Sequence, residues 1–472
     1  MREDARDNID DQEFYETINR FKKSLVSGKV EYFDVSDFED IIEKLLDEGD
    51  LEMAELAVAQ GIKIHPNATP LQVKNAQILL SKGDIKEALE NLKEVEKVET
   101  TNPDVYLLKG TAYTIEGDEQ NAVEAFKLAI RYAKDELDDI LYHIGAAFVH
   151  SGDMKMAIKY MEKAYRVNPE NETVLYELGF FYDQAGDTAK SIYYYNKYLD
   201  IDPFNNTVWY NLGIVYNKIQ EYNNAIEAYD YALALNEKFH QAVFNKANTL
   251  ANMEKYREAI RLYREFLEGD PNNDEAYCYI GECYMNLENF RKALQCYQKA
   301  IRLNQKNDNA WYGAGLIMLF EKQFEESIVF IKKAIKIDNT ISDYWFSLGK
   351  IYTDLKDFEK AIISFNKAVT IEPDNTEMWL TYTETVYNIG QTKKSVALLE
   401  EACRLNDRDA LLKYRLSAYL FLQGNEKKAL GYFAKGLRLN FGEYNSVLDI
   451  YPSAAHKESV KKLINRYRPG VR

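Results

Sequence analysis

A small residue recurs along this chain at an almost constant interval of 34 residues. Alanine or serine occupies this position twelve times, and every interval is 34 except one of 35. The positions are Ala54, Ala88, Ala122, Ala157, Ser191, Ala225, Ala259, Ala293, Ser327, Ala361, Ser395 and Ala429. A fixed interval of this length indicates a solenoid in which one supersecondary unit is repeated along the chain.

Other positions repeat in the same register. Seven repeats have glycine twelve residues before the small residue, at Gly110, Gly145, Gly179, Gly213, Gly281, Gly315 and Gly349. The clearest copy, 206–239, follows the pattern W-x2-L-G-x2-Y…A-x3-F…A through Trp209, Leu212, Gly213, Tyr216, Ala225, Tyr229 and Ala232. This pattern resembles that of the tetratricopeptide repeat (TPR) family. The resemblance covers residues 35–443, which is 409 of the 472 residues.

The apolar residues of one repeat predict two helices. Leu212, Tyr216 and Ile219 have the i, i+4, i+7 spacing of one helical face, and a second stripe begins at Ala225 after a polar interruption. Glycine and the small residue remove bulk where two helices approach closely, and the aromatic positions fill the space between pairs. The sequence therefore predicts an all-α fold. The resemblance implies a right-handed superhelical TPR solenoid of about twelve helix-turn-helix repeats.

The segments outside the repeats predict caps, because a terminal repeat otherwise leaves an apolar face in water. Residues 1–34 form the predicted N-terminal cap, with a helix over Gln12–Ser27. Residues 444–472 are predicted to form C-terminal capping helices, around Val447–Ile450 and His456–Tyr467, followed by a basic tail. Neither segment is long enough for a catalytic domain.

Composition restricts the partners that the chain can bind. Lys and Arg total 59 against 76 Asp and Glu, a net charge of −17 that repels nucleic acids and anionic lipid surfaces. The first residues lack the apolar core of a secretory signal, and no later stretch has the length of a membrane span. Together with only four cysteines, these features predict a cytoplasmic protein. Overall resemblance to free-standing TPR proteins suggests a bacterial one.

We find no motif for catalysis, cofactor binding or metal binding. The sequence contains no phosphate-binding loop, no nucleophile elbow and no HExxH helix, and its five histidines are scattered. Cys278, Cys283 and Cys296 do not have the spacing of a zinc site. The chain is therefore predicted not to be an enzyme and to need no cofactor.

The resemblance implies that the first helix of each repeat lines a concave groove. In TPR proteins ligands contact positions two, five, nine, twelve and thirteen of the repeat. Position five carries a row of aromatic residues that we predict to bind a peptide: Tyr142, Tyr176, Tyr210, Phe244, Tyr312, Phe346 and Tyr414. A rigid ring offers a large contact area at low entropic cost. The alternative is that some of these rings cover neighbouring helices.

Polar residues occupy the other groove positions. Acidic residues dominate positions two and nine in the later repeats, and amides lie in the central ones: Glu275, Glu282, Glu377 and Glu384, with Lys350, and Asn248, Asn252 and Asn286. We predict a ligand with apolar anchors and basic character, although an ordinary solvated surface would show similar charges. The carboxylate clamp of chaperone adaptors, which needs Lys at position five, is absent.

These features predict a non-enzymatic scaffold or adaptor that binds a protein or peptide in its groove. The alternative is an assembly or regulatory subunit that binds through its convex face or its capping helices. An enzyme that holds its substrate in the groove is a third hypothesis, and it has the least support in the sequence. Neither the partner nor the oligomeric state can be derived from these residues.

Overall fold

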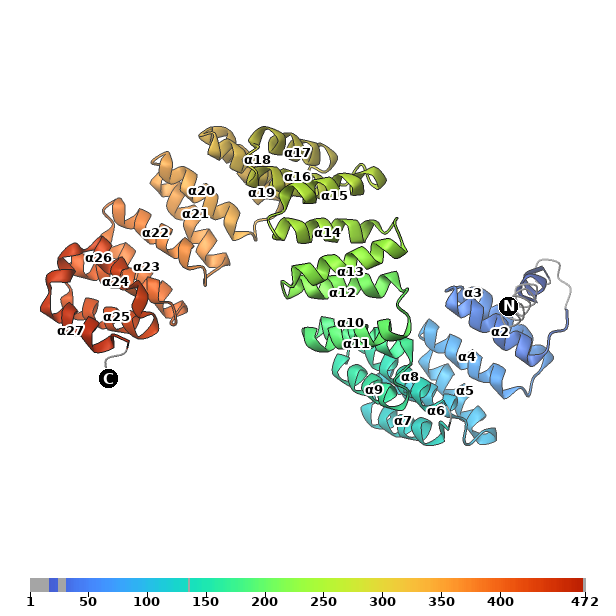
Figure 1. Cartoon of the computed structure of the whole chain (residues 1–472). Coiled ribbons are helices and arrows are strands. Elements are labelled where there is room, and N and C mark those ends of the chain that lie inside the picture. The colour runs from blue at the N-terminus through green and yellow to red at the C-terminus, as the bar shows by residue number, and fades with distance from the viewer. Residues whose placement is uncertain (1–16, 24–30, 135, 470–472) are drawn as a thin grey trace. The chain divides into compact units, whose positions relative to one another are not determined.

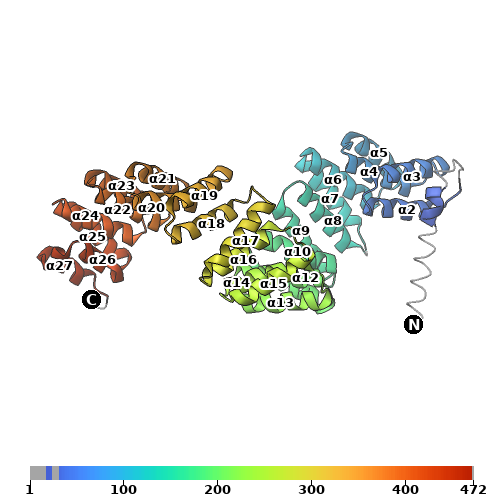
Figure 2. The same cartoon turned by 90° about the horizontal axis from the view of Figure 1, so that it is seen from above.

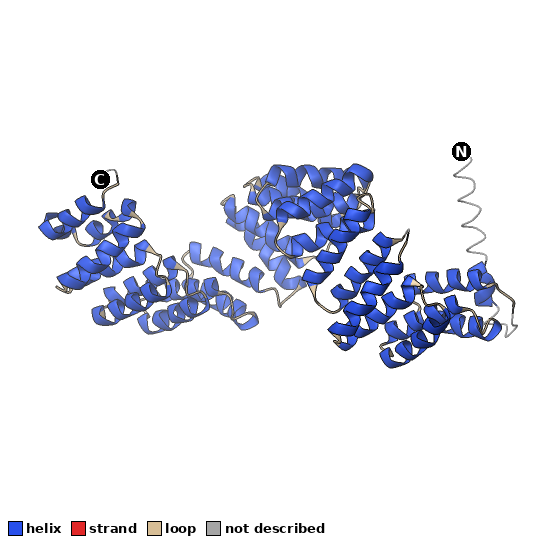
Figure 3. Ribbon diagram, turned by 90° about the horizontal axis from the view of Figure 1, so that it is seen from below, coloured by secondary structure: helices blue, strands red, loops and turns tan. Residues whose placement is uncertain are grey.

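The computed structural model describes residues 17–23, 31–134 and 136–469 of the chain. Every regular element within these ranges is a helix (Figure 3). The chain divides into two compact units, Met1–Glu237 and Lys238–Arg472. Both units consist of helix pairs that follow one another along the chain (Figures 1 and 2). The predicted all-α array of helix-turn-helix repeats is therefore confirmed.

In the described part of the first unit there are six helix pairs. Their bounds are α2 (Val35–Asp47), α3 (Leu51–Ile64), α4 (Thr69–Lys82), α5 (Ile85–Val98), α6 (Pro103–Glu116), α7 (Glu119–Tyr132), α8 (Leu137–His150), α9 (Met154–Val167), α10 (Glu172–Gln184), α11 (Thr188–Ile201), α12 (Asn206–Lys218) and α13 (Tyr222–Leu235). We call the first helix of each pair the A helix and the second the B helix, so that A helices have even numbers.

The described part of the second unit contains six more pairs and a C-terminal segment. The pairs are α14 (His240–Asn252), α15 (Tyr256–Gly269), α16 (Asp274–Asn286), α17 (Phe290–Leu303), α18 (Asp308–Phe320), α19 (Phe324–Ile337), α20 (Ser342–Asp354), α21 (Phe358–Ile371), α22 (Thr376–Asn388), α23 (Thr392–Leu405), α24 (Ala410–Leu422) and α25 (Glu426–Leu439). The segment contains η1 (Phe441–Glu443), α26 (Asn445–Ile450), η2 (Pro452–His456) and α27 (Glu458–Tyr467).

The repeated glycine lets the two helices of a pair approach each other. The small residue near the start of the B helix is buried in all twelve repeats. A Cβ atom on Gly213 would lie 2.5 Å from Cε1 of Tyr229, and one on Gly349 would lie 2.6 Å from Cδ1 of Phe365. Real Cβ atoms do not come this close, so only glycine allows the buried ring of the B helix to pack against the A helix. This confirms the interpretation made from the sequence.

The turn between A and B helices needs a left-handed residue. Gly83 and Gly117 fill this position with φ values of 86° and 78°, which glycine adopts without strain. The repeats from α12 to α21 use other residues there, such as Glu288 with φ of 56° and Lys356 with φ of 61°. For a residue other than glycine, this left-handed backbone conformation costs about 1–2 kcal/mol.

The tryptophans fix the turn between repeats. The indole Nε1 of Trp209 donates a hydrogen bond to the carbonyl of Pro203, six residues earlier, at 2.9 Å. Trp311, Trp345 and Trp379 make the same bond at 2.8 to 3.1 Å. The four tryptophans therefore have a structural role at the boundary between repeats.

Lys413 occupies the tryptophan position of the last repeat. Its side chain is only 3% exposed, and its ammonium group donates to the carbonyl of Asp407, again six residues earlier, and to those of Asn406 and Asp409. The lysine thus replaces the indole as a donor to the same backbone position.

Both ends of the described chain are covered by extra segments. Residues 17–23 are helical, and Phe21 is buried with Phe33 and Phe38; the remainder of the helix expected over Gln12–Ser27 lies outside the described residues. At the other end, α26 packs on α24 and α27 packs on α25. The domain boundaries at residues 34 and 443 stay a prediction.

Candidate functional site

The A helices of each unit lie on one side of the helix pairs. Several neighbouring A helices contact one another, for example α6 with α8 and α16 with α18, whereas no two neighbouring B helices among the described residues have contacts of this extent. In a repeat array, the helices that pack more closely lie on the inner side of the curvature. The A-helix face of each unit is therefore its inner face, and the predicted site residues all lie on A helices.

The aromatic row at position five is largely part of the core. Each of five rings contacts the ring nineteen residues later on its own B helix, with centroids 5.6 to 6.3 Å apart: Tyr176, Tyr210, Phe244, Phe346 and Tyr414. Tyr414 is fully buried and donates a hydrogen bond to the carbonyl of Asn440. Tyr142 and Tyr312 are half-buried. These rings cover neighbouring helices, as the alternative interpretation held; Phe346 and Tyr414 are buried, and the other five are partly exposed.

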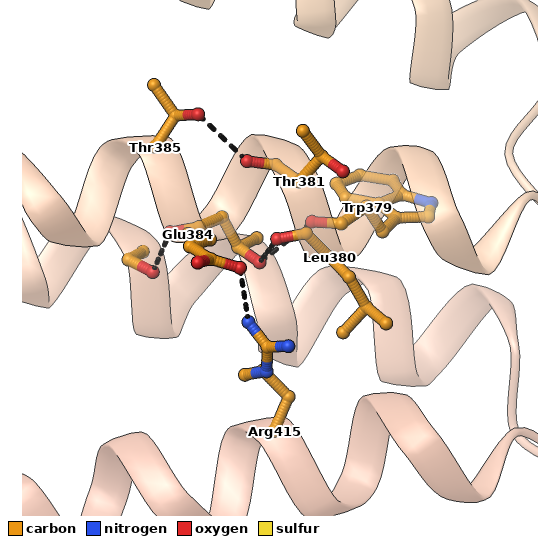
Figure 4. A network of polar contacts seen from close by, with 8 residues as sticks. Trp379, Leu380, Thr381, Glu384, Thr385 and Arg415 are labelled. Atoms are coloured by element: carbon orange, nitrogen blue, oxygen red, sulfur yellow. Dashed lines mark hydrogen bonds and ion pairs between the residues drawn. The ribbon is translucent and has the colours of Figure 1, made fainter. Parts of the chain in front are cut away.

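The acidic residues at positions two and nine lie at the surface. Glu275, Glu282 and Glu377 are exposed, and none of the three forms an ion pair within the described ranges. Glu384 differs, because its Oε2 is 2.9 Å from Nη1 of Arg415 on the next A helix (Figure 4). The acidic surface is therefore neutralised at its C-terminal end.

The remaining polar residues of the predicted site differ in their availability. The side-chain carbonyl of Asn248 accepts a hydrogen bond from the hydroxyl of the buried Tyr263 at 2.5 Å. Asn286 donates to the backbone carbonyl of Glu282 at 3.1 Å. Lys350 is exposed, and its Nζ lies 5.3 Å from the ring centre of Phe346. Asn252 is exposed at the end of α14.

The described A helices carry three exposed rings that were not predicted as site residues: Phe180, Tyr279 and Phe320. Tyr279 packs against Phe244 and Tyr263, whereas the other two rings are at groove positions. Phe180 on α10 is at position nine and is 40% exposed. Phe320 on α18 is at position thirteen, is 66% exposed and contacts Phe290 in a tilted arrangement with ring centroids 4.2 Å apart. A signal was available for Phe320, because the equivalent positions of neighbouring repeats carry the polar residues Asn286 and Asp354.

Charged groups from three A helices meet in the first unit. The carboxyl group of Asp104 on α6 has a raised pKa because its desolvation outweighs the attraction of His143 on α8 and Lys74 on α4. Desolvation also raises the pKa of Glu177 on α10. Asp104 is exposed and Glu177 is half-buried, so the desolvation of both carboxyl groups fits a surface that is flanked by neighbouring helices.

The described residues contain no group of three or more His, Cys, Asp or Glu side chains that could hold a metal ion. No helix among them is long and apolar enough to cross a bilayer. Burial raises the pKa of the free Cys278 and Cys403 thiols to about 12, so neither is a ready nucleophile. Two surface hollows have volumes of about 330 and 380 Å³. Each is lined by residues of a single B helix, so neither lies between two helices.

Sequence profiles of one family match the chain over most of its repeats. Tetratricopeptide repeat profiles match residues 103–136, 142–206, 207–239, 244–287, 274–307, 308–341 and 342–375. The chain is a tetratricopeptide repeat protein. Such repeats are generally non-enzymatic scaffolds for protein interactions. No curated protein matches the sequence.

Solved structures of other TPR proteins are similar to parts of this one. The crystal structure of MamA is 27% identical and covers 34% of this chain and 95% of its own, with a TM-score of 0.34. A TPR protein from Parabacteroides merdae is 23% identical and covers 50% of this chain and 93% of its own, with a TM-score of 0.39. YrrB, described as a TPR protein with an unusual peptide-binding site, is 21% identical and covers 38% and 92%, with a TM-score of 0.33. We draw no functional conclusion from these partial matches.

Proposed function

We propose that this TPR protein is a non-enzymatic scaffold that binds a protein or peptide on the A-helix face of its units. The observation that carries the proposal is an exposed ring on that face in each unit, Phe180 in the first and Phe320 in the second. Aromatic side chains that are exposed to solvent beside charged residues are typical of binding hot spots. The buried thiols and the scattered histidines support a binding role over catalysis.

The chemistry of the face defines the proposed partner. Phe180 and Phe320 would receive apolar side chains, and the unpaired carboxylates of Glu275, Glu282 and Glu377 would attract basic ones. The row at position five then forms the floor under these groups. The partner is thus a segment with apolar anchors and basic residues. We propose that binding takes place in the cytoplasm, where four free cysteines are stable.

Affinity purification with quantitative mass spectrometry tests this proposal. The variant Phe180→Ser/Phe320→Ser removes the exposed rings, and Glu282→Lys/Glu377→Lys reverses two charges at sites without ion pairs. Both changes are at the surface, so the helical circular dichroism should stay unchanged. We expect each variant to lose the partners that the unaltered chain recovers. Unchanged recovery with both variants would refute the use of the A-helix face.

The alternative site on the capping helices can be separated in the same experiment. Deleting residues 444–472 is a poor test, because Val447, Ala454 and Val460 are buried against the last repeats. Lys461→Glu/Lys462→Glu changes two exposed residues of α27 instead. If this variant loses the partners and the A-helix variants keep them, the cap is the binding site.

A further inference from the structure

Two exposed aliphatic residues occupy equivalent positions on consecutive B helices of the second unit. Val329 on α19 and Ile363 on α21 each lie two residues after the buried small residue of their repeat. They are 58% and 61% exposed. The equivalent residues of the neighbouring B helices are Gln295 on α17 and Ala397 on α23. The aliphatic pair is therefore confined to two repeats.

A row of lysines lies one helical turn further along the same side. Lys299 on α17, Lys333 on α19 and Lys367 on α21 each follow by four residues the position occupied by Val329 and Ile363. Residues four apart share one side of a helix. The lysine row and the aliphatic pair therefore form one surface, which we call the lysine face and define as Lys299, Val329, Lys333, Ile363 and Lys367.

Two of these lysines lie over aromatic rings and are not paired with carboxylates. The Nζ of Lys299 lies 5.8 Å from the ring centre of Tyr277, and the Nζ of Lys333 lies 5.9 Å from that of Trp311. No lysine of the face forms an ion pair within the described ranges. A cation over a ring keeps its remaining N–H donors directed to solvent. The ammonium groups are thus oriented while their charge is not neutralised.

The contrast with α15 shows that this arrangement is not a general property of the B helices. At the equivalent positions, α15 carries Arg261 and Glu265, which supply opposite charges one turn apart. On α23 the same two positions carry Ala397 and Glu401. Uncompensated lysines beside exposed aliphatic residues occur together only on α19 and α21 among these neighbours.

We propose that the lysine face binds an acidic protein segment that carries aliphatic side chains. Carboxylates of the segment would pair with Lys299, Lys333 and Lys367, and its aliphatic side chains would cover Val329 and Ile363. A nucleic acid supplies negative charge but no aliphatic side chains to cover Val329 and Ile363. This surface is on the B helices and requires a partner of opposite charge to the one proposed for the A-helix face. The two proposals are therefore independent.

Fluorescence anisotropy with a defined probe tests the lysine face on the full chain. The probe is a labelled synthetic helical peptide with leucines on one side and glutamates beside them. We expect it to bind, with affinity falling as salt is added. Lys333→Glu/Lys367→Glu and Val329→Ser/Ile363→Ser should each weaken binding by about tenfold. Lys155→Glu/Lys159→Glu on α9 makes the same charge change at exposed residues elsewhere and should leave binding unchanged.

Several results would overturn the proposal. If the α9 control variant weakens binding equally, only the net charge of the chain matters. If Val329→Ser/Ile363→Ser has no effect on binding, the aliphatic residues do not contact the peptide. If vesicles of phosphatidylserine and phosphatidylcholine bind while the peptide does not, the face recognises lipid. If sedimentation velocity shows self-association that Lys333→Glu/Lys367→Glu abolishes, the face belongs to contacts between copies. Circular dichroism of each variant establishes that it is folded.

Discussion

Gly349→Ala should destabilise the second unit, although alanine favours helices. The added Cβ would lie 2.6 Å from both Cδ1 and Cε1 of Phe365, whose side chain is fully buried. The ring cannot move away without disturbing the core, and such overpacking costs about 1–3 kcal/mol. Higher helix propensity returns about 1 kcal/mol. The difference between the two effects is a loss of about 0–2 kcal/mol. Because the ring is fully buried, we expect the free energy of unfolding to fall by about 1–2 kcal/mol.

Gly431→Ala is the matched control, because Gly431 lies within helix α25 and no atom is within 4 Å of the Cβ position. It should stabilise the unit by about 0.5–1 kcal/mol. The two glycine substitutions thus have opposite predicted signs. Phe365→Leu should make room for the new methyl group, so the double variant with Gly349→Ala should lose less than the sum of the single changes.

Urea unfolding followed by tryptophan fluorescence measures these differences. Trp345 is in the same repeat as Gly349, and Trp311 and Trp379 lie in the adjacent repeats. Because repeat arrays can unfold in segments, the variants should be compared by the transition of these probes and by far-ultraviolet circular dichroism. If Gly349→Ala stabilises the chain as much as Gly431→Ala does, the close approach of helix and ring does not limit this position.

Substitutions at three other residues test separate parts of the structure. Glu288→Gly removes a side chain from a left-handed residue and should stabilise the second unit by about 0.5–1 kcal/mol in urea unfolding; a loss would show that φ is not strained there. Lys413→Ala leaves buried carbonyls without their donor and should cost about 2–4 kcal/mol, and Lys413→Trp, which restores a donor, should cost less in the same assay. Asp138 has a lowered pKa, since hydrogen bonds from Asn171 and Asn168 outweigh its desolvation. Its contribution is therefore present above its ordinary pKa of 3.8 and is lost as pH falls through the folded value. Asp138→Asn should flatten the acid loss of thermal stability, and an unchanged acid limb would contradict this.

The fold could be predicted because the same pattern of small and large residues recurs from repeat to repeat. Gly213 and Tyr229 recur as a glycine and a ring sixteen residues apart, and the structure places such rings against such glycines. A repeated spacing removes the ambiguity that a single helix pair would leave. Boundaries between helices followed from the same register.

The site was harder to predict. The position of a residue within the repeat shows which side of a helix it is on, but not how deeply its side chain is buried. Tyr414 and Phe320 are both at groove positions, yet Tyr414 is fully buried and Phe320 is mostly exposed. Phe433 and Gly436 of the B helix both pack against the ring of Tyr414, whereas Phe320 is the last residue of α18. Likewise, the pairing of Glu384 with Arg415 joins residues of neighbouring repeats. Contacts of this kind depend on both helices together, so the sequence of one helix does not reveal them.

Site-specific photo-crosslinking in cells tests the central claim most directly. A benzophenone amino acid extends phenylalanine by a benzoyl group, which the exposed positions 180 and 320 can accommodate, and it reacts with a bound partner. We expect covalent adducts with a partner protein from each of these positions, and none from position 159 on the exposed side of α9. Adducts absent from positions 180 and 320 but formed from position 462 on α27 would contradict that claim.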